Sequence, residues 1–112
     1  MKVFNDPDLD LVEAASAFAA LGSEQRLSVL RTLVRAGPDG LSIGDLGTRT
    51  GVTGSTLTHH MKILLQAGLV EQEKHGRSII CVSVAYDRAK VLSEFLMTEC
   101  CADAPDGGHD HG

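Results

Sequence analysis

The fold is decided by one stretch of sequence, TGSTLTHHMKILLQA, at residues 53–67. At about 100° per residue, Leu57, Met61, Leu64 and Leu65 gather on one side of a helix, a pattern that predicts packing on a core. Small and polar residues occupy the first turn and the opposite side: Thr53, Gly54, Ser55, Thr56, Thr58, His59, Lys62 and Gln66. His60 falls at the edge of the apolar side. The stretch therefore predicts a helix with one buried face and one polar face that is open to a partner.

A shorter helix is predicted just before this stretch, with Ser42 as its N-cap, Ile43 and Leu46 facing inward and Gly51 at its exit. Two short helices joined by a turn that contains glycine are typical of a helix-turn-helix unit. In that unit the N-terminal half of the second helix enters the major groove of DNA. The predicted DNA-binding residues are Thr53, Ser55, Thr56, Thr58, His59, Lys62 and, from the segment that follows, Arg77.

The flanking sequence predicts a hairpin and three further helices. Residues 69–73 and 78–84 are expected to be strands joined by a turn at 74–77, which would form a wing beside the DNA. A first helix is expected from Asp6-Pro7 to Leu21-Gly22, a second from Ser23 to Gly37, and a last one from Asp87 to about Cys101. The apolar positions expected to face the core are Leu9, Val12, Ala15, Phe18 and Ala19 in the first helix and Leu27, Leu30, Leu33 and Val34 in the second.

These elements define a mainly α fold with a β-hairpin, a winged helix-turn-helix. The chain has 112 residues, which is room for one domain. We expect residues 1–102 to form the DNA-binding and dimerisation domain. Residues 103–112 form an acidic, histidine-containing tail that we expect to be disordered.

The charge distribution supports a nucleic-acid partner, although the formal net charge is −5. Residues 49–82 carry four basic and two acidic side chains, a local charge of +2, and local sign governs steering more than the total does. No apolar run approaches the roughly 20 residues that span a bilayer, and we expect no export signal and no membrane partner. The cysteines Cys81, Cys100 and Cys101 are odd in number, so a secreted disulfide framework is not expected and a cytoplasmic location is.

The chain resembles the arsenical-resistance repressor (ArsR/SmtB) family over roughly residues 10–100. The resemblance is carried by residues 21–33, by STLTHHM at 55–61 through Leu64, by AGLV at 67–70 and by Gly76-Arg77. It implies a homodimeric winged-helix repressor that leaves double-stranded operator DNA when a metal or metalloid binds. It also implies a dimer built from the first and last helices.

The sequence departs from the family pattern at three places, and these departures limit which base contacts and ion-binding sites we expect. Many members have a glutamine where Gly54 stands, so one base contact is expected to be missing. Some members bind an ion through cysteines before the recognition helix, but residues 44–50 contain none. Others hold zinc through Asp and His ligands on the last helix, and here that helix has Asp87 and Glu94 but no histidine. Neither of those ion sites is expected.

Cys100 and Cys101 remain as the predicted inducer site. Thiolates select soft ions, and trivalent arsenic and antimony species (arsenite, antimonite or methylarsenite) are soft in this sense. Some similar family members carry a cysteine pair here for arsenicals; two small buried side chains are the plainer alternative. Neighbouring residues of a regular helix do not face each other, so the last turn is expected to loosen. Cys81 lies in a predicted strand and is expected to be structural, with a role as third ligand left open.

Other functions remain as alternatives. A thiol redox or persulfide sensor of the same fold would need Cys81 to join one of the pair, because a disulfide between neighbours is strained. His109 and His111 could form a weak site for a transition metal. An enzyme is not expected, because no nucleophile motif surrounds any cysteine. A winged helix that binds only proteins is disfavoured by the basic segment.

Overall fold

The structure is a computed structural model and describes residues 9–105. Its elements are, in chain order, α1 (Leu11–Ala20), α2 (Glu24–Ala36), a 3-10 turn η1 (Gly37–Asp39), β1 (Leu41–Ser42), α3 (Ile43–Thr50), α4 (Gly54–Gln66), β2 (Val70–His75), β3 (Ser78–Ser83) and α5 (Ala85–Met97). The predicted mainly helical fold with a hairpin wing is confirmed. No helix within residues 9–105 has the length and apolar character that crossing a membrane requires.

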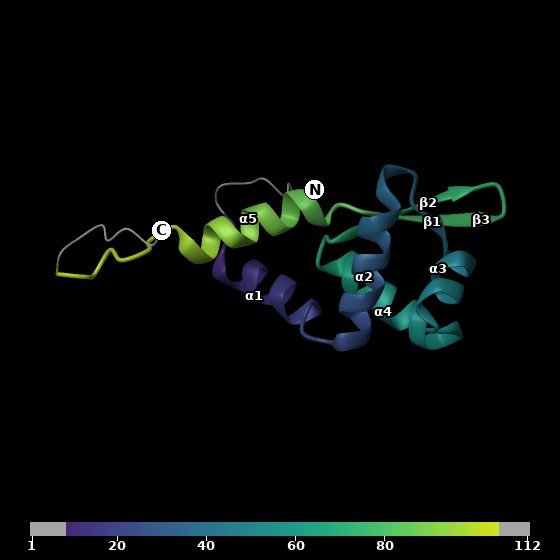
Figure 1. The fold of residues 1–112 in the computed structure, drawn as a ribbon, viewed down its shortest axis with the longest axis horizontal. Coiled ribbons are helices and arrows are strands. Elements are labelled where there is room, and N and C mark those ends of the chain that lie inside the picture. The colour runs from purple at the N-terminus through teal and green to yellow at the C-terminus, as the bar shows by residue number, and fades with distance from the viewer. Residues whose placement is uncertain (1–8, 106–112) are drawn as a thin grey trace.

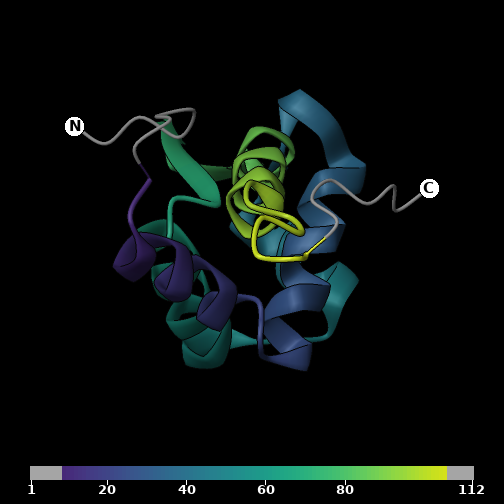
Figure 2. The same ribbon diagram turned by 90° about the vertical axis from the view of Figure 1, so that its left-hand side faces the viewer.

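The molecule is elongated, with principal extents of 58 × 28 × 23 Å. In Figure 1, α2, α3, α4 and the sheet form one end, and α5 with α1 extends from it. Figure 2 looks nearly along α5 and shows α1 beside it. This arrangement separates the segment expected to read DNA from the two helices expected to form a dimer.

The sheet has three antiparallel strands in the order β1-β3-β2. The hairpin was predicted, and it is tighter than expected because Lys74 and His75 extend β2 and leave Gly76-Arg77 as the turn. Gly76 has φ +64°, and glycine at the first position of a two-residue turn is what type II′ hairpins require. The two-residue strand β1 was not predicted; it pairs Leu41 with Cys81.

The first helix begins at Leu11 and not at the predicted Asp6-Pro7, which lies outside the described residues. Asp10 is its N-cap, and its carboxylate accepts a hydrogen bond of 2.7 Å from the backbone N–H of Glu13. The Glu13 carboxylate accepts in turn from the Asp10 N–H at 3.3 Å. This reciprocal pair is a capping box, and the spacing Asp-x-x-Glu was its sequence signal.

The expected inward faces of α1 and α2 are partly wrong. In α1 the buried residues are Ala14, Ala17 and Ala20, while the larger Val12 and Phe18, and the small Ala15 and Ala19, are exposed. In α2, Val29, Leu30 and Leu33 are buried, whereas Leu27 and Val34 are exposed. Both helices carry apolar residues on more than one side, so periodicity alone did not identify the side that faces the core.

Two clusters of buried residues stabilise the chain. The larger one joins α2, α3, α4 and the sheet, and includes Leu33, Leu46, Leu64 and Cys81. The smaller one joins α1 to α5 through Leu9, Ala14, Ala17 and Leu92. Helix α4 therefore packs on the larger cluster, and α1 and α5 pack on the smaller one.

The last helix ends earlier than predicted, at Met97. Cys100 and Cys101 lie in the turns that follow, and Cys101 has φ +64°. A positive φ is rare for a residue with a side chain.

Candidate DNA-binding and thiol sites

The seven predicted DNA-binding residues are all exposed. Thr53 is the N-cap of α4, and its hydroxyl makes no capping hydrogen bond. Thr58 differs from the others because its hydroxyl donates to the carbonyl of Gly54 at 3.3 Å. The first turn of α4 thus presents several small hydroxyl groups, which suit close approach to phosphates or base edges.

The turn between α3 and α4 is held by specific contacts. Gly51 ends α3 with φ +74°, the left-handed conformation common at helix C-termini. The Thr50 hydroxyl donates to the carbonyl of Leu46 at 2.8 Å and accepts from the N–H of Val52 at 3.2 Å. A Cβ at Gly47 would come within 3.2 Å of the Val52 carbonyl oxygen in the turn and 3.4 Å of Leu57 Cδ2 on α4, so α3 lies close to both.

Gly54 has φ +50° at the start of the recognition helix. A Cβ at this residue would meet nothing within 4 Å, so the space around it is open. The backbone conformation, and not a lack of room, therefore favours glycine here. This accounts for glycine at a position where the resemblance led us to expect glutamine.

The wing places Arg77 at the tip of the hairpin, next to Lys74 and His75. His75 is paired with Glu73, with 2.9 Å between Nε2 and Oε1. Both side chains are mostly exposed, so this pair adds little to stability. Arg77 and Lys74 make no ion pair within residues 9–105, which leaves their charges available to a polyanion.

His60 was expected at the edge of the apolar face and is in fact buried, with 8% of its surface exposed. Its Nε2 lies 3.0 Å from Oε1 of Gln25 on α2. The pKa of His60 is lowered, first by burial and then by the nearby positive Arg26 and by His59. The imidazole is therefore a neutral, buried structural group of α4, a role that sequence reasoning missed.

Cys100 and Cys101 lie together in the structure, with their sulfur atoms 3.6 Å apart. Two sulfurs that each lie about 2.3 Å from one ion, as in zinc thiolates, are about 3.3 to 3.8 Å apart for bond angles between 90° and tetrahedral. Cys100 is exposed and Cys101 is half-buried. The observed separation falls within this range, and both residues lie in the turns that follow α5.

Cys81 lies apart from this pair. It is fully buried in the larger core at the centre of the sheet, where Gln72 Nε2 lies 3.7 Å from its sulfur. Burial raises the pKa of this thiol, and the Gln72 contact lowers it by less. In Figure 1 the strand β3 that carries it lies toward the opposite end of the molecule from the C-terminal end of α5. The fold therefore gives Cys81 a structural place and does not bring it to the pair within one protomer.

Within residues 9–105 no group of three or more His, Cys, Asp or Glu side chains could hold a metal ion. Asp87 and Glu94 of α5 are not part of any such group in the described chain. His109 and His111 lie outside the described residues, as does most of the predicted tail.

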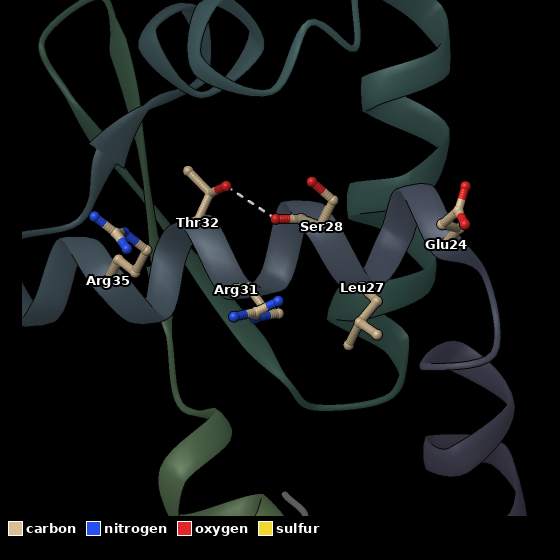
Figure 3. Close-up of a pocket in the computed structure, with 6 residues that line it drawn as sticks. All are labelled: Glu24, Leu27, Ser28, Arg31, Thr32 and Arg35. Atoms are coloured by element: carbon tan, nitrogen blue, oxygen red, sulfur yellow. Dashed lines mark hydrogen bonds between the residues drawn. The ribbon is translucent and has the colours of Figure 1, made fainter.

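A hollow of about 360 Å³ follows the exposed side of α2 (Figure 3). All of its lining comes from this one helix: Glu24, Leu27, Ser28, Arg31, Thr32 and Arg35. The Thr32 hydroxyl donates to the Ser28 carbonyl at 2.9 Å, a hydrogen bond that stays within the helix. The hollow offers no nucleophile paired with a base, so it does not resemble an active site.

A helix-turn-helix packed on a small core, with a hairpin beside it, defines this chain as a winged helix-turn-helix DNA-binding protein. A family profile described as a helix-turn-helix domain matches residues 21–73. The HTH-type transcriptional regulator NmtR of Mycobacterium tuberculosis is 37% identical over 84 residues, which cover 75% of this chain and 68% of that protein. The ArsR-like transcriptional regulator from Rhodococcus sp. RHA1 superposes with a TM-score of 0.68 at 32% identity, covering 82% of this chain and 84% of that one. The chain belongs to the ArsR family of transcriptional regulators, which are not enzymes.

Two further proteins are similar over different extents. The uncharacterized HTH-type transcriptional regulator YceK of Bacillus subtilis is 38% identical over 64 residues. That match covers 57% of this chain and 63% of YceK, so the chain spans less than two thirds of that relative. The homodimeric winged helix-turn-helix domain Mb0332 of Mycobacterium bovis shares the fold, with a TM-score of 0.64 at 22% identity over 90% of each chain.

Proposed function

We propose that this regulator is a homodimeric repressor that leaves its operator when a trivalent arsenical binds Cys100 and Cys101. The observation that supports this most directly is the 3.6 Å separation of the two sulfur atoms outside any helix. The pair is accessible, its thiols are adjacent, and no disulfide involves it.

A methylated arsenical suits the site best. Methylarsenite has two hydroxyl groups on arsenic, and each thiol replaces one of them. Two As–O bonds break, two As–S bonds form, and each thiol proton leaves with a hydroxyl group as water. Arsenite and antimonite would accept a third thiolate, and the buried Cys81 does not lie beside the pair to supply one. We therefore expect the strongest response to the ligand that needs only two thiols.

The dimer would form through α1 and α5. Both helices expose large apolar side chains, including Leu11 (72% exposed), Val12 (77%), Leu96 (67%) and Met97 (55%). Exposed apolar surface of this extent is typical of an interaction site, and a second copy of α1 and α5 offers the same surface in return. Met97 ends α5 three residues before Cys100, so ligand binding at the thiols would act at the edge of this interface.

DNA would be read by α4 and the wing of each protomer. The hydroxyls of Thr53, Ser55 and Thr56 lie on the first turn of α4, and His59 and Lys62 follow on its exposed side. A two-fold dimer would place two such helices on a pseudo-palindromic site, with half-sites about one or two helical turns apart.

The test is a titration of the operator-bound protein with methylarsenite, arsenite and antimonite, following DNA release by fluorescence anisotropy. Cys100→Ser and Cys101→Ser should each bind operator like the parent and each lose release. Removal of either sulfur abolishes the intramolecular second bond, which accounts for most of the affinity. Cys81→Ser serves as the control and should respond to methylarsenite like the parent. Unchanged release from Cys100→Ser would refute the sensor assignment.

A redox sensor that forms a disulfide within one protomer is less well supported. Consecutive Cα atoms lie about 3.8 Å apart, below the 4.4–6.8 Å that ordinary disulfides span. Cys81, the remaining candidate partner, is enclosed in the larger core. Release by hydrogen peroxide that is reversed by a reductant, without any response to arsenicals, would favour this alternative.

A further inference from the structure

The buried face of the recognition helix contains one polar side chain, that of His60. The other buried residues of α4 are Leu57, Met61 and Leu64. Apolar contacts are not directional and allow a helix to rotate or slide by small amounts at low cost. A hydrogen bond fixes both distance and direction, and the one between His60 and the exposed Gln25 is part-buried. The contact between His60 and Gln25 is therefore the one directional side-chain bond in the described chain between the buried face of α4 and α2.

The hydrogen-bonding pattern assigns the proton on this imidazole. Oε1 of Gln25 can only accept, so the Nε2 of His60 at 3.0 Å must donate. Nδ1 is then an unprotonated acceptor, and it is buried without a hydrogen-bond partner within residues 9–105. The opposite tautomer would bury an N–H donor without an acceptor, which is the rarer and costlier arrangement.

Arg26, the residue after Gln25, contacts a different helix, α1. Arg26 donates from Nε to the carbonyl of Ala20 at 2.9 Å and from Nη2 to the carbonyl of Ala19 at 3.4 Å. Both carbonyls belong to the last turn of α1, where the Ala19 carbonyl also accepts from the backbone N–H of Gly22 at 3.0 Å. Two consecutive residues in the first turn of α2 thus contact the end of α1 on one side and the recognition helix on the other.

We propose that Gln25 and His60 are positioning residues for DNA binding, whose hydrogen bond fixes the recognition helix α4 on α2, and that Arg26 connects this joint to the dimerisation helix α1. The inference rests on the proposed role of α4 in reading DNA. Neither Gln25 nor His60 needs to contact the operator. A rotation of α4 after the bond breaks would displace Ser55, His59 and Lys62 together, and base contacts tolerate little displacement.

A double-mutant cycle on operator affinity tests the hydrogen bond between Gln25 and His60. Gln25→Ala removes the acceptor of the His60 Nε2–H, and His60→Phe removes the donor while it keeps a ring of similar size. Each variant should bind operator about tenfold more weakly than the parent, a reduction that corresponds to roughly 1.4 kcal/mol. The double variant should bind no more weakly than the worse single variant, because both changes break the same bond. Ser28→Ala, which removes an exposed polar side chain from α2 close to Gln25, should bind like the parent.

If the double variant bound operator about a hundredfold more weakly than the parent, the two single effects would be independent, because independent sites are additive in free energy. That result would overturn the proposal. Binding by Gln25→Ala within twofold of the parent would overturn it as well. A parent protein that binds no promoter DNA would instead refute the proposed function.

A measurement on the unmodified protein covers the case in which a variant fails to fold. Long-range ¹H–¹⁵N spectra at pH 7.5 should show His60 as a neutral imidazole protonated at Nε2. A proton on Nδ1 would contradict the proposed contact directly.

Discussion

Arg26 Nε lies 2.9 Å from the carbonyl oxygen of Ala20, so the guanidinium of the second helix closes the end of the first. The contact satisfies a carbonyl that the helix leaves open, and it places a positive charge at the negative end of the α1 dipole. Arg26→Met keeps much of the side-chain volume and removes both effects. We expect the free energy of unfolding to fall by about 1 to 2 kcal/mol, measured by urea denaturation. Arg35→Met, at an exposed position of the same helix, should cost much less, and an equal cost would show that the Ala20 contact contributes nothing specific.

The three cysteines should differ in reactivity. Burial makes Cys81 inaccessible and raises its thiol pKa, so it should resist alkylation in the folded protein. Cys100 is exposed and should react first with iodoacetamide at pH 8, as peptide mass spectrometry would show. Cys81 should become labelled only when urea unfolds the chain. Rapid labelling of Cys81 in native buffer would contradict its place in the core.

Stability should depend on pH through His60. Its pKa in the folded protein lies below the ordinary value of about 6.5, so the unfolded chain binds the proton more readily. The part of the free energy of unfolding that comes from neutral His60 should therefore be complete above the ordinary pKa of about 6.5. It should decrease as the pH falls from 7 towards 5. Arg26 and His59 also lower the pKa of His60, so their effect adds to that of burial. His60→Phe should flatten this part of the profile, measured by thermal melting at each pH, and an unchanged slope would assign the effect to other groups.

The wing should contribute charge and not sequence preference. Arg77→Ala removes one exposed cation at the hairpin tip, so it should weaken binding to all DNA sequences. The slope of log K against log salt should fall by about one counterion for each phosphate that Arg77 neutralises. Ser55→Ala, on the first turn of α4, should instead change the ranking of operator variants. An unaltered salt slope for Arg77→Ala would remove the wing from the DNA interface.

The exposed side of α1 should govern assembly. Val12 is 77% exposed on the helix that we assign to the dimer, so Val12→Asp would place a charge inside an apolar interface. We expect a monomer by analytical ultracentrifugation at micromolar concentration, with operator affinity greatly reduced. Thr48→Asp, at an exposed position of α3, should remain dimeric. A parent protein that sediments as a monomer would exclude the dimer itself.

The order of elements and the exposed face of α4 could be predicted from sequence because they follow from local signals. Gly51, Gly68 and Gly76 mark the ends of elements, and the apolar spacing of Leu57, Met61 and Leu64 fixes the buried face of α4. These signals depend on backbone geometry and periodicity, which neighbouring residues determine.

The features that could not be predicted depend on tertiary contacts. α1 and α2 have apolar residues on several sides, and only packing shows that Ala17 and Val29 face inward. The burial of His60 depends on Gln25, which is 35 positions away in the chain. The end of α5 was placed too late, because the helix ends at Met97 although residues 98–101 contain no glycine or proline to mark an end.

Gly54 bears on how this regulator can change through mutation. Its positive φ means that any residue with a Cβ at this position must strain the backbone, by about 1 to 2 kcal/mol, or alter the start of the recognition helix. Placing here the glutamine that the resemblance led us to expect is therefore not a simple exchange of side chains, although the space for it is open. The choice of side chain at this position is thus coupled to a backbone conformation, so that exchanging it also changes the stability of the fold or the start of α4.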